Sequence, residues 1–584
     1  MVGFFLLIMK HFFSGMRGGL LAGLLAFMLL ALGPVARAQA PAWQSAFAFT
    51  QPVGSTSQVT GTATDANGSV YLTGFFVGTI SFGNTTLISA GGSDVFVAKW
   101  HPATSSFIWA QRGGGTSDER ATALTINGNN LYLTGYFTSA TASFGSTTLS
   151  NNAPNNTGAD YDVFVAKLTD AGGAGSFAWA AKAGGTGADR AYTIVAAGNA
   201  VYIGGSFEGT ATFGSITLTS SRGSELFVAK LLDTGTTSVF SWVKQARSTD
   251  NSINVNALAV SGTSIYAAGS FLGATATLGT VTISNSSSNF DGFVAKLTDV
   301  GSTADFVWAH RMGGVDTDNV QGLAVRSNAL YVSGNFLGTA TFGNLTLNSV
   351  GLYDLFVAKL TDAGSSGSFI WVQRAGGLDN DYAPALVVNG TSLCVGGAFK
   401  GTADFGNTTL TAAGDFDVFA AKIIDAGSTG SFTWAQRAGG TGIDAAATVV
   451  LDRNTIYIAG GLTPPASFGN FAVAGQPGTR TGFLASLTDA TLTSTTPALS
   501  GAAFTLSPNP ARTSTTVQLP ALPSATTVTL TVLDVLGRAV RSATVALPPA
   551  GLRHELSLTG LAPSLYVIKV QAGAATAARR LVVE

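Results

Sequence analysis

Charged residues are scarce in this sequence. They make up 10% of its 584 positions, against about a quarter in a typical soluble protein, and the net charge is −1. So few charges argue against a coiled coil or another long helical protein. Without a concentrated basic surface, nucleic acid is not expected as a partner. The hydrophobic fraction of 46% argues against general disorder.

Cysteine and histidine are scarce as well. The single cysteine, Cys394, excludes an intramolecular disulfide. The four histidines, His11, His101, His310 and His554, exclude a metal site built from several histidines. No unique nucleophile or acid stands beside His310, so the sequence predicts no catalytic, cofactor-binding or metal site. It assigns no binding residues either.

Only one long apolar run is present, Leu20 to Leu32, and it lies near the N-terminus. Lys10 and Arg17 precede it, and Pro34 and small residues up to Ala38 follow it, as in a secretory signal peptide. We expect cleavage after Ala38, and a retained membrane anchor is the alternative. No other run reaches the roughly 18 apolar residues of a spanning helix, and no cysteine follows for lipid attachment.

Glycine, by contrast, is abundant at 73 residues, which favours short strands joined by tight turns. An internal repeat of roughly 64 residues dominates the chain after residue 40, and its markers define seven units. Phe-Val-Ala-Lys or a variant starts at Phe96, Phe164, Phe227, Phe293, Phe356, Phe419 and Phe483; a tryptophan stands at Trp43, Trp109, Trp179, Trp242, Trp308, Trp371 and Trp434; Tyr-x-x-Gly starts at Tyr71, Tyr132, Tyr202, Tyr266, Tyr331 and Tyr457, with Cys394 in the sixth place.

Each unit contains four principal stretches with strand character and none with a sustained helical period. In the second unit these stretches are Phe107 to Arg112, Ala121 to Ile126, Leu131 to Gly135 and Asp162 to Leu168. One such sheet cannot bury both of its faces, whereas sheets packed face to face in a closed ring can. The sequence therefore predicts an all-β fold with a seven-bladed β-propeller, and an open β-solenoid is the alternative. The Phe-Gly segments, such as Ala142 to Gly145, are expected to extend each blade as a hairpin.

The order Asp-x-Phe-Val-Ala-Lys-Leu, Trp, Gly-Gly, Tyr-x-x-Gly resembles the bacterial seven-bladed β-propeller repeat family, over roughly Trp43 to Leu487. The resemblance implies the fold and no particular activity. The inserted Phe-Gly segment departs from the family pattern, so the family's blade length does not carry over.

Repeated charges allow two interpretations. A base stands three residues after the tryptophan in five units, and an acid follows seven residues later across a Gly-Gly turn. We expect each base to pair with this acid across a hairpin, and a ring of cations that binds an anionic polymer is the alternative. The bases are Arg112, Lys182, Arg311, Arg374 and Arg437, and the acids are Glu119, Asp189, Asp318, Asp381 and Asp444; Ala46 and Gln245 replace the base where Gln58 and Ile253 replace the acid.

A second acid and a lysine stand five residues apart in six units. This odd separation places the two side chains on opposite faces of a strand, so any pair should form with a neighbouring strand or blade. A calcium site built from these acids is a further alternative, although the dense acid spacing of a calcium loop is absent. The acids are Asp94, Asp162, Glu225, Asp291, Asp354 and Asp417, and the lysines are Lys99, Lys167, Lys230, Lys296, Lys359 and Lys422; Thr481 and Ser486 replace both in the last unit.

The repeated tryptophans and tyrosines are expected to pack one blade against the next. Trp100, His101 and Tyr353 fall outside the repeat consensus and are better candidates for a surface contact. Cys394 occupies a tyrosine's place in an apolar strand, so we expect it to be buried and inert.

A different β module begins at Phe504, with six or seven alternating strands typical of a small β-sandwich. Pro-Asn-Pro at 508–510, Leu-Asp-Val-Leu-Gly-Arg at 533–538 and Leu-Tyr-Val-Ile-Lys-Val at 565–570 resemble the C-terminal sorting domain of the type IX secretion system. The resemblance implies passage through the periplasm and across the outer membrane, with the type IX machinery as a partner. An autonomous adhesive sandwich is the alternative.

The predicted organisation is a signal peptide (1–38), a seven-repeat β-propeller (39–487), a linker (488–503) and a sorting domain (504–584). We expect a secreted or cell-surface protein that serves as a non-enzymatic binding or scaffold module for an extracellular glycan or protein. An extracellular enzyme that acts on glycans or proteins from the mouth of the propeller channel is the alternative.

Overall fold

The computed structural model describes residues 40–152, 160–250, 252–285, 287–492, 504–519, 527–534, 538–548, 551–572 and 575–584. The predicted signal peptide and most of the predicted linker lie outside the described residues, as do positions 535–537 of the C-terminal motif. Every secondary-structure element in the described part is a β-strand, which confirms the all-β prediction. None of the described residues forms a helix long and apolar enough to cross a membrane.

Consecutive strand pairing divides the repeat region into seven antiparallel units of four strands, several of which are joined by further pairings into larger sheets, and we number the units repeat sheets 1 to 7. In chain order their strands are β2 (Thr56–Thr64), β3 (Val70–Val77), β6 (Asp94–His101) and β7 (Ser106–Gly115); β8 (Glu119–Asn127), β9 (Asn130–Phe137), β12 (Asp162–Asp170) and β13 (Gly175–Gly185); β14 (Arg190–Ala197), β15 (Ala200–Phe213), β16 (Ile216–Asp233) and β17 (Ser238–Ser248); β18 (Ser252–Ser261), β19 (Ser264–Leu272), β22 (Asp291–Asp299) and β23 (Ala304–Gly314); β24 (Asn319–Arg326), β25 (Ala329–Phe336), β28 (Asp354–Asp362) and β29 (Gly367–Gly377); β30 (Asp381–Asn389), β31 (Ser392–Phe405), β32 (Thr408–Asp425) and β33 (Gly430–Gly440); and β34 (Ala445–Asp452), β35 (Thr455–Leu462) and β38 (Thr481–Thr488), with β1 (Trp43–Ala48) as the fourth strand of repeat sheet 7.

The first strand of each repeat sheet contacts the first strand of the next, and we call these seven the inner strands. The contacts run from β2 to β8, β14, β18, β24, β30 and β34, and then from β34 back to β2. The circuit of contacts is therefore closed. Between β2 and β34, for example, Thr62 Oγ1 lies 2.8 Å from Thr448 Oγ1.

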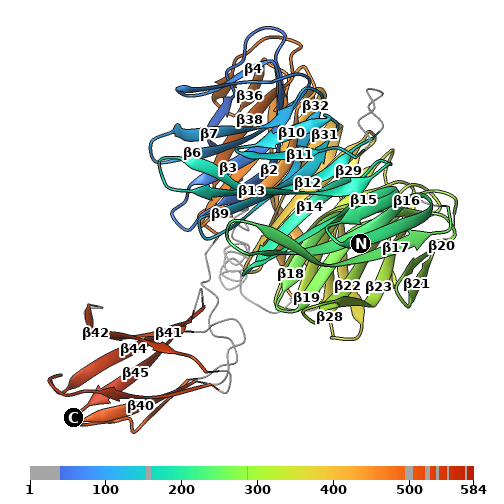
Figure 1. Ribbon diagram of the computed structural model, residues 1–584. Helices are drawn as coiled ribbons and strands as arrows, with labels where there is room; N and C mark the ends of the chain where they lie inside the picture. The colour runs from blue at the N-terminus through green and yellow to red at the C-terminus, as the bar shows by residue number, and fades with distance from the viewer. Residues whose placement is uncertain are drawn as a thin grey trace, which may run out of the picture. The chain divides into compact units, whose positions relative to one another are not determined.

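The N-terminal strand β1 completes repeat sheet 7, because it pairs antiparallel with β38 from near the end of the repeat region. In this register Ala46 faces Ala485 and Phe47 faces Leu484. Figure 1 shows the orange strand β38 near the blue strand β2, which it contacts. The two ends of the repeat region are thus joined by backbone pairing as well as by side-chain contact.

Each Phe-Gly segment forms a hairpin, as predicted, but in six of the seven units the hairpin pairs with the outer strand of the preceding sheet rather than with its own, whereas among the strands β4 and β5 pair only with each other. The β10–β11 hairpin follows β9 in repeat sheet 2, yet its Ala142 pairs with Gly115 of β7 in repeat sheet 1. The separate hairpins are β4 (Thr79–Phe82) with β5 (Thr85–Ile88), β10 (Thr141–Phe144) with β11 (Thr147–Ser150), β20 (Thr275–Leu278) with β21 (Val281–Ser284), β26 (Thr339–Phe342) with β27 (Leu345–Asn348), and β36 (Ala466–Phe468) with β37 (Phe471–Val473); in the third and sixth units the hairpin continues β15 into β16 and β31 into β32.

The phenylalanine of the hairpin fills the outer core of the sheet that it joins. Phe144 packs on Phe164 of the Phe-Val-Ala-Lys segment with ring centroids 4.7 Å apart, and a Cβ on Gly113 would lie 2.5 Å from the Phe144 ring. Glycine is therefore required where the hairpin crosses the outer strand. Most of the apolar core lies between sheets, because the buried clusters combine side chains from two neighbouring repeat sheets.

The C-terminal module has two sheets over one core of its own. One sheet has the order β39-β40-β43 and the other β42-β41-β44-β45. Buried residues of both sheets, including Val517, Leu556, Leu530 and Ile568, form a single cluster, as in a β-sandwich. The strands are β39 (Thr505–Ser507), β40 (Ser514–Leu519), β41 (Thr527–Leu533), β42 (Ala539–Ala546), β43 (Leu552–Ser557), β44 (Ser564–Ala572) and β45 (Ala575–Val583).

Candidate binding face of the repeat region

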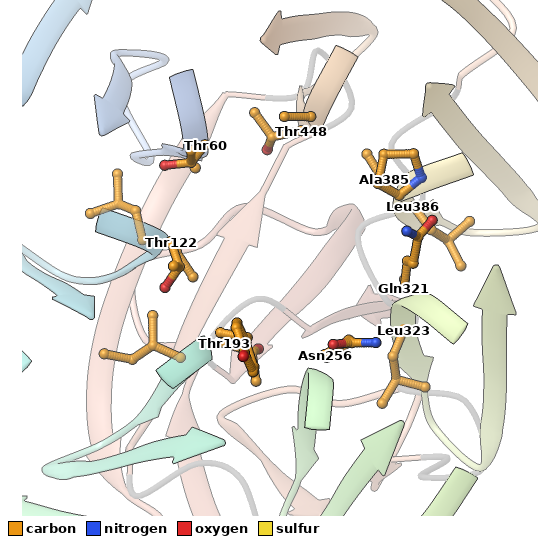
Figure 2. Close-up of a pocket in the computed structure, with 18 of the residues that line it drawn as sticks. Thr60, Thr122, Thr193, Asn256, Gln321, Leu323, Ala385, Leu386 and Thr448 are labelled. Atoms are coloured by element: carbon orange, nitrogen blue, oxygen red, sulfur yellow. The ribbon is translucent and has the colours of Figure 1, made fainter. Parts of the chain in front are cut away.

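A cavity of about 370 Å³ lies where the seven inner strands meet. Every inner strand has a β-bulge near its middle, and the bulge directs an additional residue toward this space. Figure 2 shows side chains from several inner strands arranged around the cavity. The residues at the seven bulges are Thr60, Thr122, Tyr192, Asn256, Gln321, Pro384 and Ala447.

The bulges also connect neighbouring sheets by hydrogen bonds. Thr60 Oγ1 donates to the carbonyl oxygen of Ala121 at 2.7 Å, and Thr122 Oγ1 donates to that of Ala191 at 2.8 Å. Gln321 differs, because its Oε1 atom is buried and has no hydrogen-bond partner among the described residues. The cavity therefore offers hydroxyl and amide groups, and no His, Cys, Asp or Glu is among the described residues that line it.

A buried aspartate joins repeat sheets at six interfaces. Asp299 accepts from Lys230 Nζ at 2.6 Å, Tyr202 Oη at 2.7 Å, Trp242 Nε1 at 3.2 Å and the Gly301 amide at 2.8 Å. Burial alone would raise the pKa of Asp299, but the hydrogen bonds from Lys230 and Tyr202 outweigh it and hold the pKa below its usual value. The six aspartates are Asp170, Asp233, Asp299, Asp362, Asp425 and Asp489.

This network confirms that the repeated tryptophans and tyrosines pack between sheets. The repeated lysines belong to the same network. Each one forms an ion pair with the aspartate of the next repeat sheet, as their spacing predicts for a partner on a neighbouring sheet. At the sixth interface Cys394 replaces the tyrosine and is buried, as predicted, and burial raises the pKa of its thiol to about 12. The thiol is therefore protonated at neutral pH and not reactive.

The interface between repeat sheets 7 and 1 lacks the network on both sides. Ser486 stands where other sheets have lysine, and Pro102 stands where the next sheet has aspartate. Aromatic packing replaces it: Trp100 lies 4.3 Å from Phe47 and 5.0 Å from Phe107 between ring centroids. Trp100 therefore belongs to this closing interface, which corrects its interpretation as a surface contact.

The prediction that each repeated base pairs with the acid across the Gly-Gly turn is wrong. Arg112 instead bonds Asp94 on the adjacent strand β6, and Glu119 belongs to the next repeat sheet. The turn leads from the outer strand of one sheet to the inner strand of the next, so it is not a hairpin. The equivalent pairs are Lys182–Asp162, Arg311–Asp291, Arg374–Asp354 and Arg437–Asp417. In the first unit, the residue equivalent to Glu119 is Ser57 and not Gln58, because the bulge shifts the register of the strand.

The acids that follow the Gly-Gly turn are buried beside the acids that pair with the repeated bases. Asp189 accepts from the Gly185 amide at 2.7 Å, and a Cβ on Gly184 would lie 2.2 Å from Asp162 Oδ1 and 2.9 Å from Asp189 Oδ2. Burial and the nearby charges of Asp162 and Glu208 raise the pKa of Asp189 to about 8, despite hydrogen bonds from the Gly185 and Glu208 amides. The carboxyl groups of Asp162 and Asp189 thus both pack against Gly184. The described residues contain no group of three or more His, Cys, Asp or Glu that could hold a metal ion.

The remaining candidates are half-buried rather than freely exposed. His101 lies at the end of β6, and Tyr353 packs at 6.1 Å from Tyr382 between ring centroids. Burial lowers the pKa of His310, whose ring packs at 5.4 Å from Trp308.

Sequence reasoning missed a group of side chains at the start of the inner strands. Arg190, the first residue of β14, has its guanidinium 3.9 Å from the ring centroid of Tyr161 and 5.6 Å from that of Tyr136. Arg120, the second residue of β8, lies 4.6 Å from the ring centroid of Phe75. The available signal was variation: these positions differ between units, whereas the buried positions repeat.

Residues 505–584 match the family described as the secretion system C-terminal sorting domain. The chain carries a type IX sorting domain, is handled by the type IX secretion machinery, and is exported to the cell surface or secreted. It is also similar to the regulatory protein FlaEY of Caulobacter vibrioides, with 32% identity over 122 residues, which is 20% of this chain and 12% of that protein. The chain thus spans only a small part of this relative.

Among solved structures, dimeric latent PorU from Porphyromonas gingivalis is similar over 65% of this chain and 34% of its own, at 12% identity. The TM-score of 0.12 is too low to carry an argument about fold or activity.

Proposed function

We propose that residues 39–487 form a seven-bladed β-propeller that acts, after export, as a non-enzymatic binding or scaffold module. The closed circuit of inner-strand contacts and the pairing of β1 with β38 support a ring and disfavour an open solenoid. A solenoid would have two free ends that need capping.

The contrast between repeated interfaces and a varied cavity supports a binding role. The aspartate network recurs at six interfaces, so it serves the fold. The seven bulge positions carry different side chains around one central cavity, and ligand specificity in a ring of equivalent sheets arises from such differences.

An extracellular enzyme that acts on glycans or proteins is the second candidate, because the cavity lining departs from the repeat. Hydrolysis requires a general acid or base within reach of the substrate. The lining supplies hydroxyl and amide groups instead, and the carboxyl groups with raised pKa values, such as Asp189, are fully buried. These observations favour binding over turnover.

A binding screen on the full mature protein tests this function. We expect saturable binding to a glycan or an extracellular polypeptide, reduced by the double variant T60V/T122V at the cavity. T85V/T147V, at half-buried positions of two outer hairpins away from the cavity, is the matched control. Release of products from any ligand, or absence of binding across glycans and polypeptides, would overturn the proposal.

A further inference from the structure

Three arginines near the start of the inner strands form no ion pair with a described carboxylate. These are Arg120, Arg190 and Arg480, and all three are half-buried. Arg120 and Arg190 lie two residues before Thr122 and Tyr192, which line the cavity. The repeated bases such as Arg112 are different, because each is paired with an aspartate.

Arg190 is held by aromatic groups without losing its charge. Its guanidinium lies over Tyr161 and Tyr136, whose ring centroids are 5.0 Å apart in an edge-to-face arrangement. Burial lowers the pKa of Arg190, but hydrogen bonds with Tyr161 and Tyr192 outweigh it and keep the guanidinium charged. Neutral phenols orient a cation while leaving it able to attract an anion.

Arg120 and Arg480 are oriented by neutral groups as well. Arg120 lies over Phe75, and its Nε atom is 3.4 Å from Ser93 Oγ. Asp118, which interacts electrostatically with Arg120, accepts the Ser93 amide at 2.8 Å and the Ser93 hydroxyl at 2.7 Å.

Arg480, which directly precedes β38, donates from Nε to Gln58 Oε1 at 3.1 Å. Asp444 faces Arg480 but accepts backbone amides instead, from Gly440 at 2.6 Å and Thr463 at 2.8 Å.

The three arginines occupy one side of the ring of sheets. Arg480 comes from repeat sheet 7, its partner Gln58 from repeat sheet 1, Arg120 from repeat sheet 2 and Arg190 from repeat sheet 3. Sheets 7, 1, 2 and 3 follow one another in the circuit of inner-strand contacts. At the position of Arg120 and Arg190, the other five inner strands carry Gln58, Asn254, Asn319, Tyr382 and Ala445.

We propose that these residues form an acidic-sugar site, which we call the arginine arc, and that it binds a polysaccharide with carboxylates on its sugar rings. The inference rests on the proposed binding function and names its ligand class. Guanidinium groups match carboxylates in geometry and charge, aromatic rings pack on the apolar faces of sugars, and the hydroxyl and amide groups of the cavity match sugar hydroxyls.

Other anionic polymers fit these groups less well. Nucleic acid binding relies on many phosphate contacts along a dense basic surface, and three cations on a chain of net charge −1 do not provide one. An acidic peptide would use the arginines but would leave the hydroxyl and amide groups of the cavity without sugar hydroxyls to bind.

Polygalacturonate is a suitable probe for the full mature protein, because methyl esterification removes its charge and keeps its sugar backbone. We expect binding to polygalacturonate that weakens with added salt, and weaker binding to the ester. The double variant R120Q/R190Q should bind at least about tenfold more weakly. R326Q is the matched control: Arg326 is exposed at the opposite end of an inner strand, β24, and should change affinity less than about twofold.

The outcomes separate this inference from the function on which it rests. Equal affinity for the ester, an equal loss in R326Q, or tighter binding to polyglutamate would overturn the arginine arc. If the protein binds neutral glycans or proteins but no acidic polysaccharide, the arc fails and the proposed function stands. Unchanged melting temperatures identify variants that fold, and R190K, which keeps the charge, should lose less affinity than R190Q.

Discussion

At the scale of single residues, the interfaces depend on one carboxylate that serves four donors. Lys230 is buried together with Asp299, and its Nζ atom lies 2.6 Å from Asp299 Oδ2. Breaking a buried ion pair from one side leaves an uncompensated charge, which costs more than the pair contributes.

Asp299→Ala should therefore reduce the free energy of unfolding by about 3–5 kcal/mol. Guanidinium denaturation followed by tryptophan fluorescence measures this change. Asp305→Ala is the matched control, because Asp305 pairs with Lys244 across the same two sheets but is 77% exposed. Its loss should stay below about 1 kcal/mol. Equal effects of the two substitutions would show that the buried network adds no more than a surface pair.

Asp189 gives the stability of the protein a pH dependence of opposite sign to that of the interface aspartates. Its pKa of about 8 in the fold exceeds that of an unfolded carboxyl, so between these values the native state binds more protons. Stability from this group is complete below pH 4 and is lost as the pH rises through 8. The lowered pKa of Asp299 acts only near pH 4 and below, where its stability is lost.

The free energy of unfolding should therefore be greater at pH 5.5 than at pH 8.5, and Asp189→Asn should reduce the difference. Chemical denaturation at both pH values measures it. Asp318 and Asp381 have similarly raised pKa values of about 8 and 7, so a single substitution removes only part of the dependence. A variant with an unchanged pH difference would contradict the assignment.

At the scale of strands and hairpins, the sequence predicted what repeats and missed what differs. Alternating strands, turn glycines and the regular Phe-Val-Ala-Lys motif indicated the strands, the hairpins and the packing aromatics. The pairing of Arg112 with Asp94 was missed because a sequence does not say whether a Gly-Gly turn returns to the same sheet or leads to the next. The arginine cluster at the inner strands was missed because Arg120 and Arg190 meet Phe75 and Tyr161 only after the sheets are arranged.

The close packing of the outer hairpin on Gly113 leads to a further prediction. Gly113→Ala should destabilise the protein by about 1–3 kcal/mol, because its Cβ would lie 2.5 Å from Phe144 in a packed core. Gly173→Ala is the control, since its Cβ would meet no atom within 4 Å, and its effect should stay within about 0.5 kcal/mol. Thermal unfolding compares the two. Equal melting temperatures would mean that the hairpin moves aside without loss.

At the scale of the whole chain, the repeat region and the C-terminal module have separate cores. The buried apolar residues described in the repeat region end at Leu492, and a separate cluster consists of residues from Phe504 to Val583. Export and ligand binding are therefore expected to depend on different parts of the sequence.

Deletion of residues 504–584 should retain the protein in the periplasm, because the sorting domain is the part that the type IX machinery handles. Cell fractionation with immunoblotting measures the shift, and Arg512→Ala, an exposed substitution in the intact domain, is the control that should be exported normally. The retained repeat region should still melt cooperatively, since its core uses none of the deleted residues. Normal export of the shortened chain would place the sorting signal elsewhere, and loss of cooperative melting would mean that the repeat region depends on the terminal module for its stability.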